Sequence, residues 1–412
     1  MKAISVNLYG KQDLRLESTE LPPIGDHEVL AEIVTDTMCM SSWKLLQAGG
    51  SHKKAPADLA TNPVMLGHEF CGKILQVGAA WAHRFSAGQR VIVQPALPRE
   101  SPFVPGYSYR YIGGNSTAVI VPAEVIDLDC LIPFEGRAYY EGSLCEPLSC
   151  VISAFDAQIH LIPHTYTPVS GIKQGGSLLL IGGTGPMGLL AVDYALHSDR
   201  KPKTLVVTGR GEEKLQRARR LYPSDEVEVH FVNVSGMSVD EQAAELRRLG
   251  GGGFDDVISM VSVVDVLAMA AGLLNRDGCL NQFAGPQDAS FTVPINLYDV
   301  HYNLVRVVGN SGGTPDSAAL AAKLVAEGRL DVAKVVTHVL GLDAVAETTQ
   351  DQPVIGGGKK LVYTHKAFDR IDLDAVDPAS PLGGILAAHD GLWSPEAEAW
   401  ILANMPDITV PD

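Results

Sequence analysis

The sequence has little of several features that mark specialised classes of protein. Its 412 residues contain no run of five or more like charges, and 48 acidic residues against 32 basic ones give a formal net charge of −16. An acidic chain without a basic patch repels nucleic acid and anionic lipid, so neither is expected as a partner. The 41 glycines and 25 prolines follow no collagen-like period. These absences leave a compact, soluble protein as the expectation.

Long apolar runs and paired cysteines are scarce as well. The longest apolar stretch, 177–192, is interrupted by a glycine-proline turn and is short for a membrane span, which needs about 20 residues. The first five residues reach polar side chains too early for a secretory signal. Six scattered cysteines are too few for a disulfide scaffold, so we expect reduced thiols or metal ligands in a cytoplasmic protein.

Two regions of the chain differ in their hydrophobic rhythm. Residues 1 to about 160 contain short β-like runs separated by turns, namely 29–34, 72–77 and 90–93. From about 165, strand-like runs precede helix-like segments, and these runs are 178–181, 204–207, 229–232 and 256–259. This alternation predicts an α/β fold with a doubly wound parallel sheet and helices on both faces. After about 310 the pattern loosens, and 394–405 is predicted to form a terminal helix.

A glycine turn follows the first of these later strands. It reads Gly183-Thr184-Gly185-Pro186-Met187-Gly188, a G-x-G-x-x-G pattern that opens a helix. Glycines allow the tight turn and let the backbone approach a pyrophosphate, whose charge then lies at the helix N-terminus. The strand before the turn and the helix after it favour dinucleotide binding over an ordinary glycine loop.

The end of the second strand indicates which dinucleotide is bound. NAD usually requires an acid there to accept the ribose hydroxyls. Here Thr208 and Arg210 come first, and no acid occurs until Glu212. A cation suits the 2′-phosphate of NADP, so NADP is favoured over NAD, although Arg210 could also be a solvated loop arginine.

Three separated residues have the chemistry of a catalytic zinc site. Cys39, His68 and Glu146 would supply a thiolate, an imidazole and a carboxylate, which leaves one position of a tetrahedral zinc open for substrate. Zinc in such a site polarises a carbonyl or stabilises an alkoxide. Taken singly, each residue has an ordinary explanation: a buried thiol, a core histidine, or an acid at a helix N-terminus.

Taken together and in order, these motifs resemble a known superfamily. Cys39 with Ser41, then Gly67-His68-Glu69, then Glu146-Pro147 and the glycine turn resemble the zinc-dependent medium-chain dehydrogenases, which include alcohol and sorbitol dehydrogenases. The resemblance covers residues 1 to about 365. It implies a β-rich, GroES-like catalytic domain made of 1–164 and 311–412, with a Rossmann domain inserted at 165–310.

The resemblance also implies a reaction and roles for residues. A nicotinamide and a zinc-bound alcohol or ketone would exchange a hydride, with zinc held by Cys39, His68 and Glu146. Glu69 would lie beside the metal or serve as an alternate ligand, and Ser41 would pass on the proton. By analogy with the superfamily, a homodimer or homotetramer is expected.

Departures from the superfamily pattern narrow these expectations. Residues 94–114 hold no cysteine where many members bind a structural zinc, so one zinc per chain is expected. Lys44 replaces the histidine common three places beyond the relay hydroxyl, and it could hold an anion or be a surface lysine. Lys53, Lys54 and Arg110 are the other cations that could meet a substrate phosphate, with Lys44 as first choice.

Longer strings resemble one branch, the sorbose-1-phosphate reductases. They are 36–44, 52–54, 67–72, 141–144, 284–288 and 296–302, together with the extension beyond 365. This resemblance implies reduction of a ketose 1-phosphate, such as L-sorbose 1-phosphate, to a hexitol phosphate. Two alternatives stay open: an NAD-linked polyol dehydrogenase acting on an unphosphorylated sugar alcohol, and a nucleotide-binding protein that has lost the chemistry.

Overall fold

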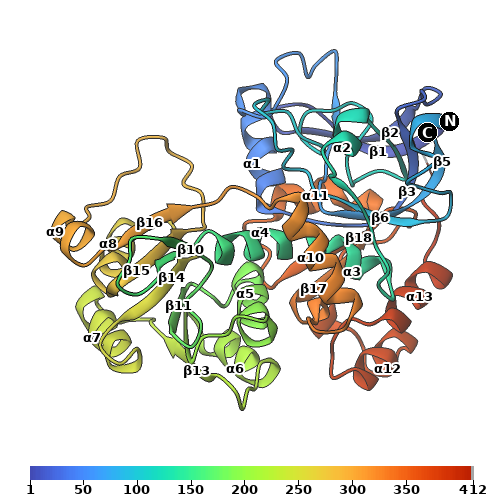
Figure 1. The fold of residues 1–412 in the computed structure, drawn as a ribbon. Helices are drawn as coiled ribbons and strands as arrows, with labels where there is room; N and C mark the ends of the chain where they lie inside the picture. The colour runs from blue at the N-terminus through green and yellow to red at the C-terminus, as the bar shows by residue number, and fades with distance from the viewer. Residues whose placement is uncertain (410–412) are drawn as a thin grey trace. The chain divides into compact units, whose positions relative to one another are not determined.

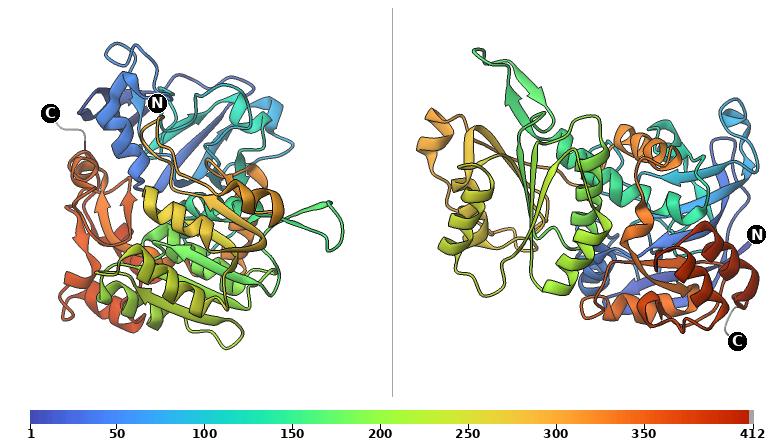
Figure 2. Two further views of the ribbon diagram at one scale, coloured as in Figure 1. Left: turned by 90° about the vertical axis from the view of Figure 1, so that its left-hand side faces the viewer. Right: turned by 90° about the horizontal axis from the view of Figure 1, so that it is seen from below.

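The computed structural model describes residues 1–409, which divide into two compact units. The first unit consists of Met1–Pro147 and the chain from Thr314 onward, and the second of Leu148–Gly313. The first boundary lies earlier than the predicted residue 164. The change of unit falls within α4 (Cys145–Asp156), and the hairpin of β9 (Ile159–Leu161) and β10 (Pro168–Ser170), which projects from the second unit in Figure 2, is tied to its sheet, because His160 Nε2 lies 2.8 Å from Asp256 Oδ1.

The second unit is built on a six-stranded parallel sheet with the order β13-β12-β11-β14-β15-β16. The strands are β11 (Ser177–Ile181), β12 (Thr204–Gly209), β13 (Glu228–Asn233), β14 (Phe254–Ser259), β15 (Leu274–Gln282) and β16 (Arg306–Gly309). Helices α5 (Pro186–His197) and α6 (Glu212–Leu221) cover one face, and α7 (Val239–Leu249) and α8 (Val264–Gly272) the other (Figure 1). The predicted doubly wound parallel sheet is confirmed.

The strand order places the glycine turn where such sheets bind ligands. Strands β12 and β14 both pair with β11, so the order reverses at β11, and ligands of open α/β sheets bind beside that reversal. The central strands are apolar because both of their faces are covered, and Leu178, Leu180 and Val257 are fully buried. Helix α8 ends at Gly272, and β15 begins two residues later at Leu274.

The first unit is rich in β-strands drawn from both parts of the chain. Its larger sheet follows the path β19-β17-β18-β3-β5-β6-β8, with β7 paired to β3, and a smaller sheet has the order β2-β1-β4. The first strands are β1 (Lys2–Gly10), β2 (Asp13–Glu20), β3 (Val29–Thr37), β4 (Val64–Met65), β5 (Phe70–Val77), β6 (Arg90–Val93), β7 (Ala118–Val121) and β8 (Leu131–Pro133). The late ones are β17 (Val336–Gly341), β18 (Lys359–Tyr363) and β19 (Ile371–Asp372). Since β18 pairs with β3, the late segment completes a sheet that the early segment begins.

Short helices connect and cover these strands. They are α1 (Met40–Ala48), α2 (Ala123–Asp127), α3 (Tyr139–Ser143), α10 (Pro315–Ala326), α11 (Val345–Asp351), α12 (Pro381–Ala388) and α13 (Pro395–Asn404). Helix α4 (Cys145–Asp156) begins in the first unit and continues into the second. The terminal helix predicted at 394–405 corresponds to α13. Within residues 1–409, every helix is too short or too polar to cross a lipid bilayer.

The extension beyond residue 365 is anchored in the core of the first unit. Trp393 is buried and its Nε1 donates a hydrogen bond to the Tyr363 hydroxyl (2.9 Å). Glu398 on α13 accepts hydrogen bonds from the backbone N–H groups of Tyr139 (2.7 Å) and Tyr140 (2.8 Å). The extension therefore caps α3, the short helix that leads into Cys145 and Glu146.

Candidate active site

Strand register explains how distant residues meet in the first unit. Strands β3 and β5 are antiparallel, with Asp36 opposite Phe70. Cys39 follows the end of β3, and His68 with Glu69 precedes the start of β5, so the three residues lie at the same end of the strand pair. Gly67 has φ +97°, and a Cβ at this position would collide with Asp36 and Asn115, so only glycine fits this turn.

The ligand atoms of these residues form a compact group. Within residues 1–409, Cys39, His68 and Glu69 are the one set of three or more metal-binding side chains whose ligand atoms all lie within 4.8 Å of one another. The Ser41 hydroxyl donates to Cys39 Sγ (2.9 Å) and lies 3.4 Å from His68 Nε2. The predicted relay hydroxyl therefore contacts two of the predicted metal ligands.

Tyr107 adds a hydroxyl that the sequence did not single out. It lies in the loop 94–117, and its phenol donates to Ser41 Oγ (2.6 Å) and is 3.2 Å from His68 Nε2. Burial is the main cause that raises the pKa of Tyr107 well above its ordinary value. The phenol is therefore neutral and remains a donor toward Ser41.

Glu69 is held by a buried ion pair. Both of its carboxylate oxygens accept from Lys359 Nζ on β18, at 2.6 Å for Oε1, and one also accepts from the Thr37 hydroxyl. Lys359 is buried, and although burial opposes its charge, Glu69 raises the pKa of the lysine above its ordinary value. Asp36 fixes the backbone beside this pair, because its carboxylate accepts from Glu69 N (2.9 Å).

Glu146 lies in the first turn of α4 and is buried. Its pKa is raised to about 7, first by burial and then by the charge of Glu69, while His68 lowers it. Helix α3, just before it, packs tightly on β5, since a Cβ at Gly142 would collide with Cys71 Sγ. The predicted ligand Glu146 is outside the group of three residues whose ligand atoms lie within 4.8 Å of one another, but the charges of Glu69, His68 and Cys39 act on it.

The charge state of this group fits a divalent metal ion. Burial lowers the pKa of His68, so the imidazole is neutral and has a lone pair to offer, and its Nδ1 is buried without a hydrogen-bond partner in the described part of the chain. Burial and then the charge of Glu69 raise the pKa of the Cys39 thiol. Two buried carboxylates and a thiol around a single buried lysine leave an excess of negative charge that zinc would neutralise.

The glycine turn of the second unit has the packing expected of a nucleotide loop. Gly182 adopts φ +71°, and a Cβ at Gly188 would collide with the backbone of Gly183, so the start of α5 packs directly on the turn. Gly185 is the N-cap of α5, Pro186 is its first residue, and the space where a Gly185 side chain would lie is open. Thr184 and Met187 are half-buried members of the same turn.

The residues predicted to select the dinucleotide lie beside this turn. Thr208 accepts from Gly182 N through its hydroxyl (3.1 Å) and from Gly183 N through its carbonyl (2.8 Å), and Arg210 is exposed just beyond β12. Glu212, the first acid after the strand, accepts from Arg219 (2.7 Å) and from Asn233 Nδ2 (3.1 Å). Its carboxylate is therefore engaged with these two side chains.

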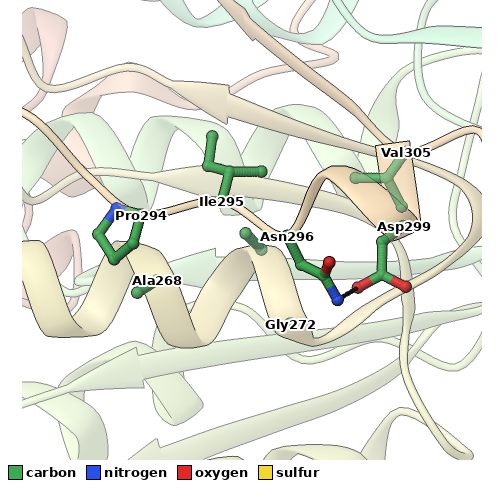
Figure 3. Close-up of a pocket in the computed structure, with 8 residues that line it drawn as sticks. Ala268, Gly272, Pro294, Ile295, Asn296, Asp299 and Val305 are labelled. Atoms are coloured by element: carbon green, nitrogen blue, oxygen red, sulfur yellow. Dashed lines mark hydrogen bonds between the residues drawn. The ribbon is translucent and has the colours of Figure 1, made fainter. Parts of the chain in front are cut away.

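A hollow elsewhere in the second unit has different chemistry. Ala268, Pro294, Ile295 and Val305 give it apolar walls, and its acid Asp299 accepts from Asn296 Nδ2 (2.9 Å) at the start of α9 (Leu297–Tyr302; Figure 3). The Asp299 carboxylate is occupied by this hydrogen bond at the start of α9, so the residues that line the hollow offer no catalytic group.

The structure separates the predicted residues into those that meet and those that lie farther out. Cys39, Ser41, His68 and Glu69 meet directly. Lys44 lies on α1 and acts electrostatically on His52, whose pKa it helps to lower after burial, Lys54 and Lys53. Sequence reasoning missed Tyr107 and Lys359, because a loop tyrosine and a strand lysine carry no motif of their own.

Comparison with known families agrees with this geometry. Residues 25–128 match the alcohol dehydrogenase GroES-like domain, and residues 186–327 match the zinc-binding dehydrogenase domain. The L-sorbose 1-phosphate reductase of Klebsiella pneumoniae is 50% identical over 98% of each chain. This chain belongs to the zinc-dependent medium-chain dehydrogenases. As a member of that family it is an oxidoreductase of the zinc- and nicotinamide-dependent alcohol dehydrogenase type.

One further curated relative and one solved structure are also similar to this chain. The mannitol-1-phosphate 5-dehydrogenase of Aliivibrio fischeri is 38% identical to this dehydrogenase over 96% of each chain. Among solved structures, a zinc-binding dehydrogenase of Sinorhizobium meliloti bound to NADP superposes with a TM-score of 0.71 at 23% identity, covering 88% of this chain and 99% of that one. The latter likeness shows the shared fold.

Proposed function

We propose that this dehydrogenase reduces a ketose 1-phosphate to a hexitol phosphate with NADPH, and that L-sorbose 1-phosphate is the first substrate to test. The observation that carries the proposal is the 50% identity with L-sorbose 1-phosphate reductase over 98% of both chains. The 38% identity with mannitol-1-phosphate 5-dehydrogenase also supports a hexitol phosphate as substrate or product.

In this proposal Cys39, His68 and Glu146 hold one catalytic zinc per chain. Glu69 stays beside it, paired with Lys359, and can replace Glu146 as a ligand. Loop 94–114 has no cysteine for a structural zinc. When bound, zinc supplies a Lewis acid for the substrate carbonyl, and reduced nicotinamide supplies the hydride.

The residues of this chain supply the proton. As the carbonyl carbon gains a hydride, its oxygen gains the proton of the Ser41 hydroxyl. The Tyr107 phenol, which donates to Ser41 Oγ at 2.6 Å, stabilises the serine oxygen as it loses this proton, and Ser41 regains a proton from solvent before the next turnover. Lys359 holds the Glu69 carboxylate in an ion pair beside this relay.

The proposed preference for NADP rests on two residues between β12 and α6, Arg210 just after the strand and Glu212 at the start of the helix. Arg210 offers a cation for the 2′-phosphate, whereas Glu212, which could have accepted the ribose hydroxyls of NAD, is bonded to Arg219 and Asn233. The glycine turn 183–188 and Thr208 would hold the rest of the dinucleotide.

The test is coenzyme oxidation by the zinc-loaded protein. NADPH and NADH are each offered with L-sorbose 1-phosphate, fructose 1-phosphate and the two free ketoses. We expect NADPH with a ketose 1-phosphate to give the highest kcat/KM. Activity with free ketoses or polyols alone, or with NADH alone, would favour the NAD-linked polyol dehydrogenase instead. Zinc binding without turnover of any pair would favour a non-catalytic protein.

We also propose a cytoplasmic homo-oligomer. Within residues 1–409 the six cysteines form no disulfide bond, as expected in a reducing compartment. Strand β16 is an edge of the second-unit sheet, and exposed apolar side chains of Leu297, Tyr298 and Tyr302 lie on α9 shortly before it. Light scattering would report a dimer or tetramer, and a monomer would contradict this part of the proposal.

A further inference from the structure

A short loop concentrates positive charge in an otherwise acidic protein. His52, Lys53 and Lys54 are consecutive, and Lys44 lies on the neighbouring helix α1. After burial, the charges of Lys54, Lys53 and Lys44 all lower the pKa of the half-buried His52 imidazole, so all three lysines lie close to one side chain. In a chain of net charge −16, such a cluster attracts an anion locally.

Tyr107 links this cluster to the candidate metal ligands. Lys54 Nζ lies 4.6 Å from the centre of the Tyr107 ring, and the His52 ring stacks on the same tyrosine at 6.1 Å and 17°. The hydroxyl end of that ring contacts Ser41 and His68. A single aromatic side chain therefore separates the basic cluster from the group that would bind a carbonyl.

Lys54 is the cation of this basic cluster whose charge acts on the candidate metal ligands. Its charge acts on His68, whereas Lys53 is exposed, and Arg110 is exposed and directed at Asn62, with its guanidinium over the Tyr111 ring. The Lys54 backbone is fixed on both sides, because its N–H donates to His52 Nδ1 (3.2 Å) and its carbonyl accepts from Ser108 (2.6 Å).

The same backbone bond defines what His52 can do. Since Nδ1 accepts a hydrogen bond, a neutral His52 ring has its proton on Nε2 and can donate it. An ammonium and an imidazole N–H facing the same tyrosine form a suitable pair for a phosphate. In a ketose 1-phosphate only one carbon and one oxygen separate the carbonyl carbon from phosphorus, so the phosphate must bind next to the carbonyl site.

We propose that Lys54 and His52, aligned on the ring of Tyr107, bind the phosphate group of the substrate and set the preference for phosphorylated ketoses. This inference rests on the proposed function. It differs from the expectation based on sequence, which ranked Lys44 first; the charge of Lys44 acts on His52 less than those of Lys54 and Lys53 do.

The first experiment compares Lys54→Met with Lys53→Met in zinc-loaded protein. Both changes remove one lysine charge from the same loop, and Lys53 is exposed. We expect Lys54→Met to lower kcat/KM for L-sorbose 1-phosphate by about 10- to 100-fold, as the loss of a charged hydrogen bond does. Its kcat/KM for free L-sorbose should stay within about 3-fold of wild type, and Lys53→Met should change neither value beyond that. An equal loss on both substrates, or an equal loss in Lys53→Met, would overturn the inference.

A second measurement separates the inference from the proposed function. Inorganic phosphate is titrated calorimetrically into the zinc-loaded wild type, Lys54→Met and His52→Ala. Phosphate binding that weakens about 10-fold or more in both variants supports the subsite even if the wild type shows no preference for ketose phosphates, in which case only the proposed function fails. Phosphate binding that is absent, or equal in all three proteins, overturns the subsite.

Discussion

The two candidate sites of this dehydrogenase are built in opposite ways. The nucleotide turn consists of six consecutive residues, 183–188, and depends on backbone space, since a Cβ at Gly188 would collide with Gly183. The candidate metal site (Cys39, His68 and Glu69) is made of side chains from separate segments, and its ion pair joins Glu69 to Lys359, 290 positions later. The first site is sensitive to added atoms and the second to the loss of a single charge or ligand.

Removal of one thiol should have the largest effect on activity. In Cys39→Ala we expect zinc to fall from about one per chain to a small fraction, and kcat/KM to fall by about 10³-fold or more, because Lewis-acid stabilisation contributes several kcal/mol. Zinc is measured by atomic absorption and NADPH binding by fluorescence. NADPH binding should persist, since the turn is independent of the thiol, and a fully zinc-loaded, active variant would refute the assignment.

Removal of the buried counterion tests how strongly the candidate metal site depends on charge. Lys359→Met leaves Glu69 buried and unpaired, so the free energy of unfolding should fall by about 3–5 kcal/mol in urea titrations of zinc-free protein. Lys360→Met is the matched control, because that ammonium is bonded to neutral backbone carbonyls, including Gly356 O (2.9 Å), and its loss should cost less. Adding Glu69→Gln to Lys359→Met should restore part of the stability, and a double variant no better than Lys359→Met would argue against the ion pair.

The extension beyond residue 365 should make the stability of the first unit depend on pH, through Glu398. Burial raises the pKa of Glu398 from an ordinary 4.5 to about 7, partly offset by the N–H groups of Tyr139 and Tyr140. The folded state therefore binds a proton more tightly, and the resulting stability is complete below about pH 4.5 and lost as pH rises through about 7.

The measurement compares wild type with Glu398→Gln, which cannot titrate. The stability of wild type relative to the variant should decline by up to about 3 kcal/mol between pH 4.5 and 8, measured by urea unfolding in the presence of a chelator. A constant difference across this range would contradict the raised pKa of Glu398.

Single methyl groups should distinguish the two roles of glycine in the turn, with the smallest effects of the series. Gly188→Ala forces α5 away from the turn and should cost about 1–3 kcal/mol of stability. Gly185→Ala points into open space, so stability should change by less than about 0.5 kcal/mol. NADPH affinity should nevertheless drop about 10-fold, because the methyl group lies where a pyrophosphate would approach. Unchanged NADPH affinity in Gly185→Ala would show that the dinucleotide does not bind against this turn.

The contrast between the sites also explains what could be predicted from the sequence. The turn and the strands and helices around it are local features: their periodicity and glycine spacing are visible in a short window, and the sheet follows from them. The candidate ligands could be named because they stand in an ordered set that resembles a family. Lys359, Tyr107 and Glu398 could not be named, because each acquires its role only from a partner that the fold brings from far along the chain.

Because the first unit is made of two separated segments of the chain, the two units must fold at different times during synthesis. The second unit is one continuous segment, 148–313, and can fold as soon as it has left the ribosome, whereas the first unit must wait for residues from Thr314 onward. Until then Glu69 lacks the lysine that neutralises it, α3 lacks its Glu398 cap, and β3 lacks its neighbour β18. We therefore expect the nascent chain to contain a folded second unit while the first unit is still incompletely folded. Zinc should be retained only after the last strand and helix of the first unit have been added.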